Sequence, residues 1–155
     1  MALEQDIRRL SRSPLLGALS PDALRLIAFS AEPVRLAKGD VLFRRGDPAD
    51  AAYFVAEGAI GFHDDDQPYD DAPRLRAGPD SLIGEAAMLA EVERPATARA
   101  LEATTVLKIP RAILRRVLTE FPDDAAQMRA ALARSIRSFG EDLTAFGVRA
   151  GETGR

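Results

Sequence analysis

Residues 38–60 read KGDVLFRRGDPADAAYFVAEGAI, and the expected fold follows from this stretch. It contains short apolar runs at residues 41–43 and 53–55, separated by turns that contain Gly39 and Gly46. Apolar runs of this length, bounded by turn residues, are typical of β-strands. Glycine is common in such turns because it adopts positive φ angles without a steric penalty. The stretch therefore predicts two early strands of an antiparallel β-structure.

The same pattern of short apolar runs and turns extends over residues 32–110. Further apolar runs lie at residues 34–36, 60–62, 98–101 and 106–109. Many short strands separated by glycine-containing turns indicate an antiparallel β-barrel or sandwich. Within this region, residues 63–74 read HDDDQPYDDAPR, which predicts an exposed and mobile loop between two strands rather than a calcium loop.

Helical patterns flank the β-region on both sides. Apolar residues recur at helical spacing before it, and Ser20-Pro21 is a typical helix start, because serine caps the first turn and proline fits its first position. After the β-region, one amphipathic helix ends at Phe121-Pro122 and a second follows. The prediction is one α+β domain over residues 1–155, with helices at 3–30, the barrel at 32–110 and C-terminal helices at 111–146.

Composition excludes several classes of protein. The 155 residues include no cysteine, which excludes disulfides, thiolate catalysis and zinc–cysteine sites. No apolar run approaches the roughly 20 residues of a membrane span, and the N-terminus lacks a signal-peptide pattern. We therefore expect a cytoplasmic protein without a membrane span. The net charge of −3 and the interspersed arginines and acids argue against nucleic-acid binding.

Catalysis and metal binding are not expected. His63 is the only histidine, so the chain cannot build the His–Asp metal cluster of a phosphodiesterase. The three aspartates that follow it could form half of a weak surface metal site with it. A solvated strand end is the interpretation we favour for His63.

One segment carries residues suited to a sugar phosphate. Residues 81–89 read SLIGEAAML, which predicts a short helix that starts at a glycine and offers free N–H groups to an anion. Arg94 follows and could give a forked, charge-assisted contact to a phosphate. Glu85, in the first helical turn, could accept a hydrogen bond from a hydroxyl beside that phosphate. Each feature alone is weak, and their combination predicts the pocket.

This segment resembles a known motif. Residues 84–88 read GEAAM, the spacer LAEVE follows, and residues 94–97 read RPAT. The phosphate-binding cassette of the cyclic nucleotide-binding domain family is similar: Gly-Glu-x-Ala-Leu, a short spacer, then Arg-x-Ala-Thr/Ser. The family is found in bacterial catabolite activators, regulatory subunits of cyclic-AMP-dependent kinase and cyclic-nucleotide-gated channels. The resemblance covers residues 10–139 and implies a barrel of the double-stranded β-helix, or jelly-roll, type.

The resemblance also implies roles for residues. Arg94 would pair with the phosphate oxygens, and Glu85 would accept from the ribose 2′-hydroxyl. The ligand-binding residues that it implies are Gly84, Glu85, Ala86, Ala87, Arg94, Pro95, Ala96 and Thr97. A residue of the last helix would close over the purine, and the candidates are Arg134, Ser135, Arg137 and Ser138. Pro95 departs from the family because it has no N–H to donate, which predicts one phosphate contact fewer.

The resemblance also implies which ligand binds and what binding does. A hydroxyl residue directly after the arginine is associated with cyclic GMP, so Pro95 favours cyclic AMP, while Thr97 leaves cyclic GMP open. The expected function is a stand-alone, non-enzymatic receptor that transmits binding of cAMP or cGMP through its C-terminal helix, to a protein partner or a homodimer. The alternatives are a degenerate domain that acts as a protein-interaction module, or a sensor of another effector such as haem or an organic acid.

Overall fold

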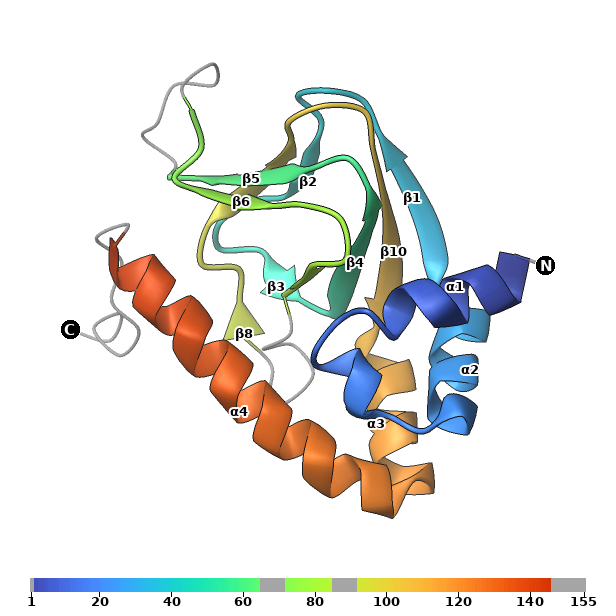
Figure 1. Ribbon diagram of the computed structural model, residues 1–155. Helices are drawn as coiled ribbons and strands as arrows, with labels where there is room; N and C mark the ends of the chain where they lie inside the picture. The colour runs from blue at the N-terminus through green and yellow to red at the C-terminus, as the bar shows by residue number, and fades with distance from the viewer. Residues whose placement is uncertain (1, 65–71, 85–91, 146–155) are drawn as a thin grey trace.

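The computed structural model describes residues 2–64, 72–84 and 92–145, and Figure 1 shows their arrangement. Helices lie at both ends of the chain and the strands lie between them, as the sequence predicts. The elements, in chain order, are α1 (Ala2–Leu10), the 3-10 helix η1 (Leu16–Ala18), α2 (Pro21–Ser30), β1 (Glu32–Leu36), β2 (Val41–Phe43), β3 (Pro48–Ala49), β4 (Ala51–Glu57), β5 (Ile60–His63), β6 (Leu75–Ala77), β7 (Leu82–Ile83), β8 (Val92–Glu93), β9 (Thr97–Ala100), β10 (Thr104–Pro110), α3 (Arg111–Glu120) and α4 (Pro122–Ala145).

The predicted start of the second helix is confirmed. The Ser20 side chain accepts a hydrogen bond from the backbone nitrogen of Ala23 at 3.3 Å, and Pro21 occupies the first helical position. This bond satisfies one of the N–H groups that a helix leaves free at its N-terminus. The local sequence therefore determines where α2 begins.

The strands form antiparallel sheets of the jelly-roll type. One four-stranded sheet has the order β1-β10-β4-β7, the other has the order β2-β9-β5-β6, and β3 pairs with β8. Among the described strands, hydrogen bonds do not close these sheets into one continuous barrel, because β3 and β8 pair only with each other. The expected barrel is thus an open pair of sheets with a short ribbon at one side.

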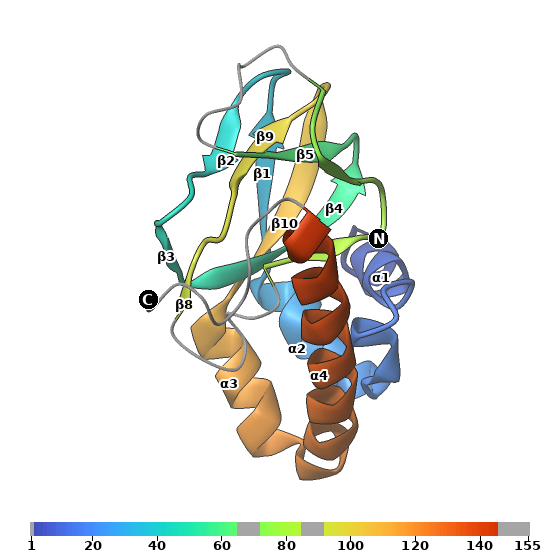
Figure 2. The same ribbon diagram turned by 90° about the vertical axis from the view of Figure 1, so that its left-hand side faces the viewer.

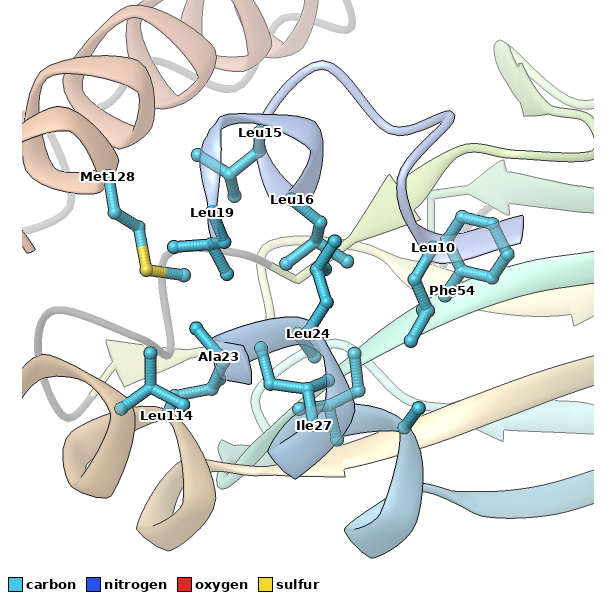
Figure 3. Packing of buried hydrophobic residues seen from close by; sticks show 14 of the residues in the cluster. Leu10, Leu15, Leu16, Leu19, Ala23, Leu24, Ile27, Phe54, Leu114 and Met128 are labelled. Atoms are coloured by element: carbon cyan, nitrogen blue, oxygen red, sulfur yellow. The ribbon is translucent and has the colours of Figure 1, made fainter. Parts of the chain in front are cut away.

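The strand β4 separates two hydrophobic clusters. Its alternate residues face opposite sides: Phe54 packs toward the helices, and Tyr53 and Val55 pack toward the second sheet. The helical cluster, shown in Figure 3, consists of Leu10, Leu15, Leu16, Leu19, Ala23, Leu24, Ile27, Ala28, Ala52, Phe54, Leu107, Ile109, Leu114, Val117 and Met128. The sheet cluster consists of Phe43, Ala51, Tyr53, Val55, Ile60, Phe62, Ala77, Ile83, Ala96, Ala98, Ala100 and Val106.

The two C-terminal helices are separated at Phe121, as predicted. In Figures 1 and 2, α4 leaves the helical cluster and runs along the side of the β-structure on which β8 lies. Ala125 and Met128 anchor the first part of α4 because both are buried. Met128 lies in the helical cluster, opposite Leu15 and Leu19 in Figure 3. Within the described ranges, no helix has the length and apolar character that a bilayer span requires.

The expectation of a solvated strand end at His63 is wrong. His63 is 4% exposed. It lies at the end of β5, which is an inner strand of its sheet between β9 and β6. The backbone of His63 pairs with Thr97 of β9, whereas the pairing with β6 ends at Phe62. Among residues 2–64, 72–84 and 92–145, no three His, Cys, Asp or Glu side chains are grouped to hold a metal ion.

Candidate functional site

The backbone around Arg94 is bound to the turn between β2 and β3. The backbone nitrogen of Arg94 donates to the carbonyl of Asp47 at 2.8 Å, and the nitrogen of Gly46 donates to the carbonyl of Arg94 at 2.8 Å. Beside this contact, β8 and β3 pair through Glu93 and Pro48. These bonds direct the Arg94 side chain inward, where it is 3% exposed.

Among the described residues, the guanidinium of Arg94 has one hydrogen-bond acceptor and two aromatic neighbours. Its Nη2 donates to the carbonyl of Ala51 at 2.8 Å. Its Cζ lies 4.3 Å from the ring centroid of Phe43 and 5.5 Å from that of Tyr53. The Nε and Nη1 atoms are buried and have no hydrogen-bond partner within the described part of the chain. Three of the five N–H groups of the guanidinium are on these two atoms.

Gly84 lies directly against this guanidinium. Its φ of +74° belongs to the left-handed region, which other residues adopt at a penalty. A Cβ atom built there would overlap Nη1 of Arg94 and would lie 3.4 Å from the carbonyl oxygen of Ala51. Glycine is therefore required here for two reasons: the backbone conformation and the space that Arg94 occupies.

The helix predicted over residues 81–89 does not begin where expected. Residues 82–83 form β7 instead, which pairs with Tyr53 and Phe54 of β4. Ile83 is buried in the sheet cluster, and this burial together with the bonds to β4 competes with a helical start. Glu85, Ala86 and Ala87 lie outside the described residues, so their expected contacts remain predictions.

The buried charge of Arg94 favours an anionic partner. Burial is the main cause that lowers the pKa of Arg94 below its ordinary value, and Arg111 adds to it, while Tyr53, Asp50 and Asp47 act in the opposite direction. Arginine nonetheless keeps its charge in proteins. A buried cation with unsatisfied N–H groups is unfavourable until an acceptor reaches it. A phosphate oxygen has the charge and the lone pairs to be that acceptor.

The residues after Arg94 are positioned by the sheet. Ala96 is buried in the sheet cluster, and Pro95 is partly exposed. The Thr97 hydroxyl accepts a hydrogen bond from the backbone nitrogen of Arg45 at 3.1 Å, which ties β9 to the β2–β3 turn. A contact of Thr97 with a ligand therefore remains a prediction beside this structural role.

Of the four predicted purine caps, only the side chain of Arg134 lies in the described part of the chain. Arg134 lies on α4 and its side chain is exposed. Ser135, Arg137 and Ser138 belong to the same helix, and their side chains fall outside the described part. The choice among the four candidates stays open.

Sequence reasoning missed the residues that surround Arg94. The apolar runs at residues 41–43 and 53–55 include Phe43 and Tyr53 only as strand members, and no expectation singles out Ala51. The alternation along β4 was a usable signal, because it places Ala51 and Tyr53 on one face. No local signal indicated that this face meets Arg94, which lies 43 positions after Ala51.

The chain is similar to a known family of domains and to several solved structures. The family model described as a cyclic nucleotide-binding domain matches residues 33–121. A cyclic nucleotide-binding-like protein of Brucella abortus is 39% identical, with a TM-score of 0.65 over 74% of this chain and 98% of that chain. The N-terminal domain of a transcriptional regulator of Streptomyces coelicolor is 33% identical, with a TM-score of 0.71 over 85% of this chain and 94% of that chain.

Curated relatives are much longer than this chain. A Rhodopseudomonas palustris protein described as a potassium channel protein is 35% identical over 118 residues, which are 76% of this chain and 28% of the relative. The match to a lysophospholipase of Neurospora crassa spans 9% of that protein. In these relatives the similarity therefore concerns one part of a larger protein.

Proposed function

The chain belongs to the cyclic nucleotide-binding domain family, and on this premise we propose that it binds a cyclic nucleotide with the phosphate at Arg94. The observation that supports the proposal is the buried guanidinium, whose Nε and Nη1 have no partner in the described part of the chain. Hydrogen bonds to a charged phosphate contribute more than neutral ones and would satisfy these groups. The role is binding and regulation rather than catalysis.

The rest of the proposed site follows the cassette. Gly84 leaves space for the guanidinium, and Glu85 accepts from the ribose 2′-hydroxyl. Pro95 offers neither an N–H nor a hydroxyl, which favours cyclic AMP over cyclic GMP. One phosphate contact fewer also predicts weaker binding than in a site with a donor at this position.

We also propose that binding is transmitted to the C-terminal helices through the junction of β3 and β4. Three consecutive carbonyls of this junction accept hydrogen bonds from two arginines. Ala49 accepts from the Arg111 side chain and Asp50 accepts from the Arg111 backbone nitrogen at 2.9 Å. Ala51 accepts from Arg94. A shift of Arg94 on binding phosphate would therefore pull on the first residue of α3.

Calorimetric titration with cyclic AMP and cyclic GMP tests the binding proposal. We expect the wild type to bind, and Arg94→Ala to lose about 1.5–3 kcal/mol of binding free energy, as for a charge-assisted hydrogen bond. Arg116→Ala is the matched control, because Arg116 is an exposed helical arginine paired with Glu120. If neither nucleotide binds at millimolar concentration, the proposal is wrong and a protein-interaction module becomes the better explanation.

Amide NMR spectra of the same titration test the transmission. Saturating nucleotide should shift the resonances of α3 and α4, because a ligand changes a conformation only when it binds one arrangement better than another. Unchanged resonances of both helices at saturation would contradict the transmission and leave the binding proposal intact.

A further inference from the structure

Two aromatic rings from different sheets meet beside Arg94. Phe43 belongs to β2 and Tyr53 belongs to β4. Their ring centroids lie 6.1 Å apart, with an angle of 34° between the ring planes. Each residue is 8% exposed, so both rings are buried together with the guanidinium that they contact. We call this pair, Phe43 and Tyr53, the aromatic seat.

Within the described part of the chain, the seat supplies most of the side-chain contacts of the Arg94 guanidinium. The guanidinium has one hydrogen bond within the described residues, to the carbonyl of Ala51. A guanidinium is flat and weakly hydrated, so it stacks well on ring faces. The attraction between a cation and a ring also strengthens when both are removed from water. The rings therefore replace part of the hydration that Arg94 loses on burial.

Two residues beside the Arg94 contacts, Asp47 and Asp50, carry carboxylates. Both act on the charge of Arg94, yet neither forms an ion pair with it in the part of the chain that the structure describes. The Asp47 carboxylate instead accepts a hydrogen bond from the backbone nitrogen of Arg44 at 3.0 Å. A guanidinium free to rotate could turn to these carboxylates, and its donors would then be lost to a ligand.

We propose that Phe43 and Tyr53 are positioning residues for the anion site and that they set its affinity. The seat fixes the plane of the guanidinium against the carbonyl of Ala51 and the backbone of Gly84. It thereby keeps Nε and Nη1 available to an incoming phosphate and away from the two carboxylates. The inference rests on the proposed function, because the affinity in question is that for the cyclic nucleotide. Phe43 should contribute more than Tyr53, since its ring lies nearer to Cζ.

Four variants test the seat by calorimetry with cyclic AMP. We expect Phe43→Leu to weaken binding about tenfold and Tyr53→Leu about threefold, in line with a desolvated cation–π contact. Tyr53→Phe retains the ring and should bind within about twofold of the wild type. Phe54→Leu is the matched control, because it makes the same change in the next residue of β4, which faces the helical cluster. It should lower stability while leaving affinity within about twofold.

A second measurement does not depend on ligand binding. In the ligand-free protein, the Nε–Hε NMR resonance of Arg94 should be displaced by the ring currents of the seat. It should move toward the value of a free arginine in Phe43→Leu and stay unchanged in Phe54→Leu. Because this readout follows the guanidinium itself, a core that is merely loosened would not reproduce the difference between the two variants.

The outcomes separate the seat from the proposed function. If folded Phe43→Leu binds as well as the wild type, or if Phe54→Leu loses as much affinity, the positioning role is wrong. If the wild type binds neither nucleotide, the proposed function fails, and the NMR comparison alone decides whether the rings hold Arg94. An Arg94 resonance unaffected by Phe43→Leu would overturn the inference in either case.

Discussion

The two hydrophobic clusters of this protein are built differently. In the helical cluster, large leucine and isoleucine side chains fill the space between the helices and the sheet. The sheet cluster contains five alanines, at positions 51, 77, 96, 98 and 100, together with the aromatic seat. Among the described residues, the buried His63 and Arg94 both belong to the β-region: His63 ends β5, and Arg94 directly follows β8. The sheet region therefore accommodates a buried cation, whereas the helical cluster consists of hydrophobic side chains packed against one another.

If the proposed function holds, stability and binding are carried by opposite faces of one strand. Phe54 of β4 is completely buried against the helices, and its neighbour Tyr53 contacts Arg94. Small residues in the sheet cluster leave volume for the rings and the guanidinium. We expect substitutions on the helical face to change mainly stability, and those on the other face to change mainly affinity.

The largest expected effect is that of Phe54→Ala on stability. The substitution leaves a cavity in the helical cluster and should lower the free energy of unfolding by about 3–5 kcal/mol. Denaturation in guanidinium chloride measures this loss. At a temperature where the variant is folded, its affinity for the nucleotide should equal that of the wild type. Reduced affinity of the folded variant would show that the two faces are coupled.

Substitution of two glycines by alanine separates backbone strain from contact with Arg94. Gly46 and Gly84 both have positive φ, so each variant should lose about 1–2 kcal/mol of stability. No heavy atom lies within 4 Å of a Cβ built at Gly46, whereas a Cβ at Gly84 overlaps Arg94. Gly84→Ala should therefore also weaken nucleotide binding about tenfold or more, as expected when a charge-assisted bond is disturbed. Equal affinities of the two variants would contradict the close approach of Gly84 to Arg94.

The smallest effect on stability is expected for Arg94→Met. Loss of the bond to Ala51 and of the ring contacts is offset by removal of a buried, incompletely paired cation. The lowered pKa of Arg94 agrees with this expectation, because it means that the charged form is less favourable in the folded protein than in the unfolded chain. At neutral pH arginine is charged in both states, so burial of its charge destabilises the folded protein. The ligand-free variant should remain within about 1 kcal/mol of the wild type in thermal unfolding, while nucleotide binding should weaken by about 1.5–3 kcal/mol, as for Arg94→Ala. A loss of several kcal/mol would instead make Arg94 a structural residue.

Much of the fold could be predicted from local patterns. The cap at Ser20 and the helix break at Phe121 depend on a few neighbouring residues, and the structure confirms both. The prediction failed at residues 82–83, where pairing with β4 overrides an apolar, helix-prone sequence. It failed at His63 for a related reason, since the burial of a side chain at a strand end depends on what packs against it in the tertiary structure.

By itself, the sequence determined the chemistry that this protein can offer: an arginine after a glycine-containing segment, strands marked by turns, and no cysteine. Only the tertiary structure placed Phe43, Tyr53 and Gly84 around Arg94. The physical reason is the distance along the chain over which each kind of interaction acts. Turn, cap and side-chain periodicities act over a few residues, whereas the burial of Arg94 arises from the register of strands that are distant in the chain.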